Sequence, residues 1–71
     1  MERFLRYSLE KGRKIRVMML WNGVITQKPA TVLQVTADTV TLQMGGKKAQ
    51  LTVPLNDILS CDYARGDHGE D

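Results

Sequence analysis

The spacing of apolar residues changes once along the chain, from a helical period to a strand period. In residues 2–11, apolar and small side chains recur at helical spacing while charged ones point away. That face carries Phe4, Leu5, Ser8 and Leu9. Gly12 follows where a left-handed cap ends a helix, and Lys11 favours the negative C-terminal end. We therefore expect a helix over residues 2–11. It must dock its apolar face on the rest of the chain, since a lone helix of about ten residues is unstable.

From residue 14 onward, apolar residues alternate with polar ones, which is the period of a strand. The pattern predicts strands over residues 14–21, 31–36, 39–44, 48–53 and 58–63. Glycine and small polar dipeptides favour tight turns between them. These turns are Asn22-Gly23, Ala37-Asp38 and Gly45-Gly46, and residues 54–57 predict a single 3₁₀ turn. We expect the segment Gln27-Lys28-Pro29 to separate the first two strands, because proline has no backbone N–H to donate to a neighbouring strand.

Alternation also predicts which side chains face the interior. The expected inward set is Ile15, Val17, Met19, Trp21, Val40, Leu42, Met44, Ala49, Leu51 and Val53. On the second strand, Leu33 and Val35 are expected to share one face. The first strand is unusual because its second half is apolar on both faces, with Met18 and Leu20 on the side away from the interior. We expect that second face to be covered by the helix or by a neighbouring subunit, which makes Met18 and Leu20 candidate interface residues.

These elements predict a mainly β fold: a short N-terminal helix followed by a five-stranded, strongly bent antiparallel sheet. A sheet of this kind tends to curl into an SH3-like small barrel, which removes exposed edges. Residues 1–63 form the expected single domain, and the glycine-rich, acidic segment 64–71 is expected to be a flexible tail.

The order of elements over residues 2–63 resembles that of the Sm-like small barrels. The run 17–23, which closes on Trp21-Asn22-Gly23, is similar to the start of the first Sm motif, and residues 39–42 resemble the apolar strand that follows. The resemblance implies a bent five-stranded sheet, ring-shaped oligomers sealed by strand pairing, and RNA bound at the loops. Lys28-Pro29 stands where the family has a second glycine, so we transfer no RNA-binding residue.

Two further resemblances add no chemistry. Residues 54–67, including the run Ile58–Asp67, resemble short bacterial proteins of uncharacterised function. The pattern of Arg13, Ile15 and Val17 after a helix is more loosely similar to the ligand-sensing WYL domain, another Sm-related barrel.

Composition limits how the domain is stabilised. A chain of 71 residues has a marginal core. Cys61 is the single cysteine and His68 the single histidine, so neither an internal disulfide nor a four-ligand zinc site is available. We therefore expect a homo-oligomer without cofactor or metal. The free cysteine and the lack of a secretion signal or an apolar span favour a cytoplasmic protein.

Charge is distributed unevenly along the chain. Residues 1–48 carry nine basic and three acidic side chains, whereas residues 49–71 carry one and five. This indicates either a polyanionic partner or complementarity between copies. The candidate residues for RNA or another polyanion are Arg13, Lys14, Arg16, Lys47 and Lys48. The alternative is a solvated rim of the barrel.

No constellation typical of catalysis is apparent. Cys61 has no histidine nearby in the sequence, Asp57 is expected to fix a turn, and Trp21 is expected in the core or an interface. The acidic tail around His68 is a weak metal-ligand pattern. The sequence thus predicts a non-enzymatic, self-associating binding module for RNA or another polyanion. The alternative is an adaptor or small regulatory subunit that docks a protein partner through an exposed apolar face.

Overall fold

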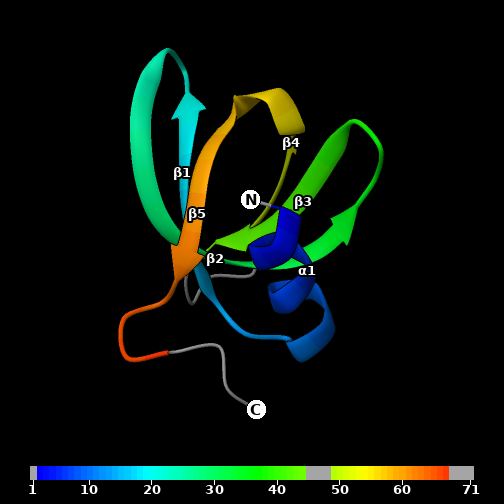
Figure 1. The fold of residues 1–71 in the computed structure, drawn as a ribbon. Helices are drawn as coiled ribbons and strands as arrows, with labels where there is room; N and C mark the ends of the chain where they lie inside the picture. Colours follow the sequence, from blue (N-terminus) through cyan, green and yellow to red (C-terminus); the bar gives the residue numbers. More distant parts are fainter. Residues whose placement is uncertain (1, 45–48, 68–71) are drawn as a thin grey trace.

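The computed structural model describes residues 2–44 and 49–67. The fold is mainly β, with an N-terminal helix followed by a five-stranded sheet, as predicted (Figure 1). The elements in chain order are α1 (Glu2–Lys11), β1 (Ile15–Trp21), β2 (Val24–Val35), β3 (Thr39–Met44), β4 (Gln50–Pro54), the 3₁₀ helix η1 (Leu55–Asp57) and β5 (Ile58–Tyr63). The predicted bounds of α1, β3 and β5 are confirmed. No helix within the described ranges is long and apolar enough to cross a membrane.

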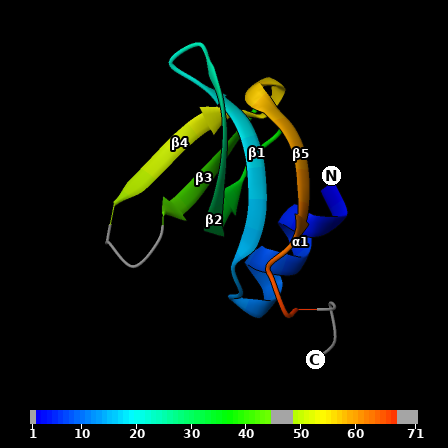
Figure 2. The same cartoon turned by 90° about the vertical axis from the view of Figure 1, so that its left-hand side faces the viewer.

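The sheet is antiparallel throughout, with the strand order β4-β3-β2-β1-β5 (Figure 2). β4 and β5 therefore lie at opposite edges. Closing a barrel requires these two edges to pair, and in the described strands β4 pairs with β3 and β5 with β1. The sheet is open rather than closed or strongly curled, so the single chain lacks the expected barrel closure.

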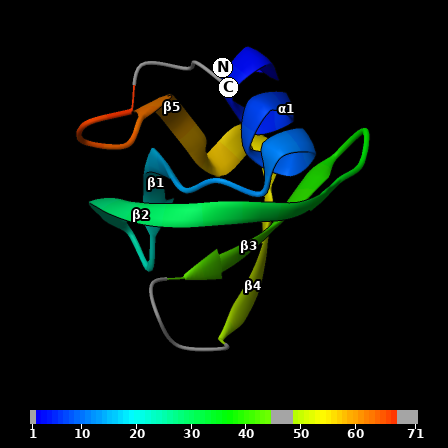
Figure 3. The ribbon, with the colours of Figure 1, turned by 90° about the horizontal axis from the view of Figure 1, so that it is seen from below.

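The second strand differs from its prediction, which began at residue 31. β2 begins at Val24 and runs through Pro29 without interruption (Figure 3). The physical reason lies in the register. Pro29 is opposite Arg16 on β1, whereas the pairing with β3 ends where Ala30 meets Met44. Along residues 24–29, the described part of β2 pairs with β1 alone, so a residue without an N–H costs no hydrogen bond on the side where β3 would lie.

Two of the predicted turns are confirmed, and each follows from local chemistry. Asn22 and Gly23 have φ values of 52° and 79°, the positive values that the turn between β1 and β2 requires. In the Ala37-Asp38 turn, the Thr36 hydroxyl oxygen accepts the backbone N–H groups of Asp38 and Thr39 at 3.2 and 2.9 Å. The predicted Gly45-Gly46 turn lies outside the described residues.

The core lies between one face of the sheet, here called the inner face, and α1. Its fully buried apolar residues are Leu5, Ile15, Val17, Met19, Ala30, Val32, Val40, Leu42, Val53 and Ile58. Most of the predicted inward positions on β1 and β3 are therefore confirmed. Met44 and Leu51 are partly buried against this cluster.

Two predicted core positions, Trp21 and Ala49, are wrong because both are exposed, and Leu33 and Val35 on β2 are exposed as well. Trp21 is 41% exposed because it lies at the tip of the β1–β2 hairpin, beyond the reach of α1. Leu33 falls where the β2–β3 register shifts between Val32 and Gln34, so alternation breaks there and Leu33 is exposed. Val35 keeps the face of its partner Val40 but lies at the end of the strand and is 36% exposed. Ala49 precedes the observed start of β4 and is exposed.

A buried serine fixes α1 to the sheet. Ser8 is fully buried; its hydroxyl donates to the carbonyl oxygen of Arg13 at 2.6 Å and accepts the backbone N–H of Val32 at 2.8 Å. Gly12, at φ 67°, donates its N–H to the Ser8 carbonyl at 2.9 Å and turns the chain toward β1. The predicted cap is confirmed. The small polar residue on the apolar helix face is what joins helix, connection and strand.

Candidate binding surfaces

The predicted polyanion-binding residues lie near the start of β1, in so far as the structure describes them. Arg13 and Lys14 are exposed in the connection between α1 and β1, and Arg16 is exposed on β1. Lys47 and Lys48 lie outside the described residues. The structure thus brings three of the five residues to one end of β1. That all five form a single basic patch stays a prediction.

Both arginines of this group already contact acidic side chains. Arg16 donates through Nη2 to the Asp62 carboxylate and through Nε to the Tyr63 carbonyl, each at 3.0 Å. Arg13 Nη1 lies 3.8 Å from Asp67 Oδ2. A polyanion at this end of β1 would have to displace or share these carboxylates, which lowers the gain from each contact.

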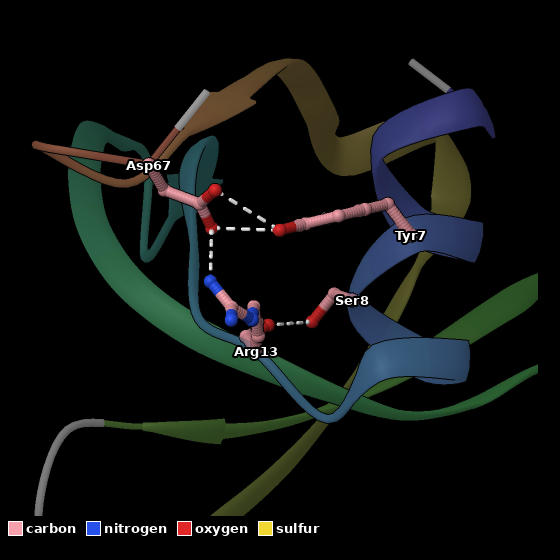
Figure 4. Close-up of polar contacts among 4 residues, drawn as sticks. All are labelled: Tyr7, Ser8, Arg13 and Asp67. Atoms are coloured by element: carbon pink, nitrogen blue, oxygen red, sulfur yellow. Dashed lines mark hydrogen bonds and ion pairs between the residues drawn. The ribbon is translucent and has the colours of Figure 1, made fainter. Parts of the chain in front are cut away.

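The C-terminal segment is attached to the helix through Asp67 (Figure 4). The Tyr7 hydroxyl lies 3.0 and 2.9 Å from the two Asp67 carboxylate oxygens, and Arg13 approaches the same carboxylate. The Asp67 N–H also donates to the Ala64 carbonyl at 2.9 Å. Residues 64–67 therefore form a defined turn against α1, whereas residues 68–71, with His68, lie outside the described residues and their flexibility stays a prediction.

Aromatic rings support the same contact. Tyr63 at the end of β5 meets Phe4 and Tyr7 edge to face, with ring centroids 4.8 and 5.2 Å apart. Partial desolvation, followed by the neighbouring Asp67 carboxylate, raises the pKa of the Tyr7 hydroxyl above its ordinary value. Tyr7 therefore stays protonated and donates to Asp67 throughout the neutral range.

The β1–β2 hairpin carries exposed apolar side chains on both faces. Leu20 and Ile25 are direct partners across the hairpin, so they share the outer face, where Met18 follows at the next position on β1. Leu20 is 41% exposed, Ile25 is 65% exposed, and Met18 is half-buried. We call Met18, Leu20 and Ile25 the outer hairpin patch. The predicted interface residues Met18 and Leu20 belong to it, whereas Ile25 was missed because residues 24–30 were not predicted as a strand.

The inner face of the same hairpin borders a pocket of about 180 Å³. Its lining comes from two hairpins that face each other, β1–β2 and β3–β4. The residues are Met19, Trp21, Thr26, Lys28, Met44 and Leu51. We call it the inner pocket. Sequence reasoning missed it because Trp21 was expected to fill the interior and Lys28 to lie in a loop.

Two of the residues considered for chemistry, Cys61 and Asp57, lie within the described part of the chain. Burial raises the pKa of the Cys61 thiol, which lowers its reactivity as a nucleophile. Asp57 ends η1, and the N–H of its neighbour Ile58 donates to the Leu55 carbonyl, in keeping with a turn role for this segment. Within residues 2–44 and 49–67, no three His, Cys, Asp or Glu side chains gather in a geometry that would hold a metal ion.

Comparison with known proteins gives no family for the chain. No family model matches the sequence, and neither a curated protein nor a solved structure matches it. The structure itself supports a small domain of an N-terminal helix followed by a five-stranded antiparallel sheet.

Proposed function

We propose that this chain is a non-enzymatic binding module that self-associates through the outer hairpin patch. The observation that carries the proposal is the pair Leu20 and Ile25, two large apolar side chains that lie opposite each other and are 41% and 65% exposed. Exposed apolar side chains that are contiguous in this way are typical of protein contacts, because burying them removes apolar area from water.

A second copy of the chain suits this patch better than a charged partner does. Met18, Leu20 and Ile25 carry no charge, and the nearest charged pair along the outer face, Arg16 with Asp62, is already joined at 3.0 Å. Packing the patch against itself about a twofold axis leaves no buried charge without a partner. It also enlarges the small core of a 71-residue chain.

The two free sheet edges are the alternative interface, at which copies of the chain would pair strand to strand and complete the expected barrel. β4 carries no charged residue and β5 carries Asp62 alone, so both edges lack the lysines that discourage pairing. Pairing β4 of one copy with β5 of the next would give the closed, ring-forming architecture implied by the resemblance to Sm-like small barrels.

Binding of RNA or another polyanion by Arg13, Lys14, Arg16, Lys47 and Lys48 belongs to the proposal as a subsidiary function. Lys14 is exposed beside the two arginines, which supports it. Such binding must weaken steeply as salt rises, because each phosphate contact releases counterions. A salt titration of single-stranded RNA binding tests it, and an affinity indifferent to ionic strength would rule it out.

Self-association is tested by analytical ultracentrifugation of the full chain over a range of concentrations. The wild type is expected to gain mass with concentration, and the double variant Leu20→Ser/Ile25→Ser to stay monomeric. Leu9→Ser is the matched control, because Leu9 is also 41% exposed but lies on α1. It is expected to associate like the wild type.

Two outcomes would contradict the proposal. A wild type that is monomeric at every concentration, yet binds a different protein through this patch, would establish the alternative function of an adaptor or small regulatory subunit. Association that survives the double variant but is abolished by Gln50→Lys/Thr52→Lys on β4 would move the interface from the hairpin to the sheet edge. Gln27→Lys on β2 is the matched control for added charge.

A further inference from the structure

We propose that the inner pocket is a binding site for a small aromatic carboxylate, with the ring held by Trp21 and the methionines and the acid by Lys28. This inference is separate from self-association, since it concerns the opposite face of the β1–β2 hairpin. Self-association can fail without affecting it.

The pocket exists because α1 covers only part of the inner face. The helix packs over the end that contains Ile15, Ala30 and Val32, where side chains are buried. Toward the tip of the hairpin, the described residues leave an open pocket whose lining includes Trp21 on β1 and Leu51 on β4. Met19, which is 1% exposed, closes the floor. An apolar floor and walls without a covering element form a concave site rather than a flat face.

The chemistry of the walls favours an aromatic ring. Trp21 offers an indole that is 41% exposed, so a ring can stack on it without any rearrangement of the core. Met19 and Met44 contribute flexible thioethers, which adapt to a ligand and make favourable contacts with aromatic edges. These three side chains come from the two hairpins, so a ring between them would bridge β1 and β3.

Size restricts the ligand to one ring. An apolar cavity of about 150 Å³ is known to hold benzene. The inner pocket, at about 180 Å³, has room for a single ring with a short acidic substituent. It is smaller than the roughly 300–1,000 Å³ typical of sites for larger organic ligands.

The positive charge of Lys28 favours a ligand that carries a carboxylate. Lys28 shares the inner face with Thr26 and Ala30, because its register partner is the buried Val17. No acidic residue lines the pocket, and among the described residues no carboxylate forms an ion pair with Lys28. The Thr26 hydroxyl donates to the Val24 carbonyl at 3.3 Å, so Lys28 is the charged donor that the lining offers to a ligand, beside the indole N–H of Trp21. A carboxylate at this point gains a charge-assisted hydrogen bond.

The chain carries its own reporters for a test. Trp21 is the only tryptophan in the sequence. Of the three methionines that the structure describes, Met19 and Met44 line the pocket and Met18 lies on the outer side. Methyl NMR and tryptophan fluorescence of the full chain are followed during titration with phenylacetate and, separately, with the neutral phenylacetamide. Phenylacetate is expected to shift the signals of Met19, Met44 and Trp21 and to leave Met18 unchanged.

The substitution Lys28→Met keeps the length of the side chain and removes its charge. It is expected to weaken phenylacetate binding about tenfold, which is the scale of one hydrogen bond to a charged group, and to leave phenylacetamide binding unchanged. Lys14→Met, at an exposed lysine outside the pocket, is the matched control and is expected to bind phenylacetate like the wild type.

Three results would overturn the inference. They are the absence of any shift at Met19, Met44 and Trp21 with phenylacetate, equal affinity for the acid and the amide, and an equal loss of affinity in Lys28→Met and Lys14→Met. Thermal unfolding of each variant, recorded alongside, confirms that the folded chain is being compared.

Discussion

The two ends of the inner face differ in what covers them. At one end, α1 lies against the sheet and buries Leu5, Ser8 and Val32 almost completely. At the other end, the β1–β2 hairpin extends past the helix (Figure 2). There Trp21 on the inner face is 41% exposed. The covered end therefore supplies most of the stability, and the hairpin end is available for contacts with other molecules.

Polar groups divide in the same way. At the covered end, the buried Ser8 hydroxyl has both a donor and an acceptor, and no buried side-chain polar atom of the described residues lacks a hydrogen-bond partner. At the hairpin end, Lys28 sits on the inner face without a carboxylate partner in the described chain. In one half of the sheet the buried polar groups are all hydrogen-bonded, whereas in the other half a charged side chain is available to bind a ligand.

The largest expected effect comes from the covered end. Leu5→Ala should lower the free energy of unfolding by about 3 kcal/mol, because it removes a buried side chain and leaves a cavity under α1. Urea unfolding monitored by circular dichroism measures it. Leu9→Ala, at the end of the same helix face where the side chain is 41% exposed, is the control and should cost less than about 1 kcal/mol. If both variants lost the same free energy of unfolding, burial would not distinguish Leu5 from Leu9, which would contradict this account.

Ser8→Ala should have the next largest effect. It leaves the Val32 N–H and the Arg13 carbonyl without their buried partner, which should cost about 2 kcal/mol in the same unfolding experiment. Ser60→Ala provides the comparison, because Ser60 is exposed on β5 and should change stability by about 0.5 kcal/mol or less. A neutral Ser8→Ala would show that the helix is held by apolar contacts alone.

A smaller effect is expected at the contact between Tyr7 and Asp67, and it depends on pH. The pKa of Tyr7 is raised in the folded chain, so its contribution is fully present below the unfolded value near 10.0 and is lost as pH rises through the higher folded value. Comparing the thermal stability of wild type and Tyr7→Phe from neutral to alkaline pH measures this. The gap between them should close in the alkaline range, and a gap that widens there would contradict the assignment.

The smallest effect on stability is expected at the hairpin end. Ile25→Ser should change the free energy of unfolding by about 0.5 kcal/mol or less, because the side chain is largely exposed in the monomer. Urea unfolding at low protein concentration isolates this term from association. A loss as large as that of Leu5→Ala would mean that Ile25 belongs to the core of the single chain.

The fold was predictable where periodicity and turn chemistry agreed. Alternation over Thr39–Met44 predicted β3 correctly, and the Asn22-Gly23 dipeptide predicted the turn after β1. The prediction was wrong along residues 24–30. A strand accepts Pro29 there because the pairing with β3 ends at Ala30, and the end of that pairing cannot be predicted from the local sequence. Leu33 was misplaced for a similar reason, since the register shift beside it is a property of the paired strands.

The candidate sites were predictable only in part. The doubly apolar character of β1 pointed to Met18 and Leu20, both of which lie on the outer hairpin patch. The inner pocket and the contact of Asp67 with Tyr7 depend on residues far apart in the chain, 60 positions in the second case. Local patterns hold no information about such pairs, so tertiary structure was needed to find them.

The proposal that the outer hairpin patch is the contact surface is tested most directly by backbone amide NMR of the wild type at increasing protein concentration. Amide signals of residues 18–25 should move together as the chain associates, while those of α1 should stay in place. Movement centred on α1, or spectra that do not change with concentration, would contradict the account.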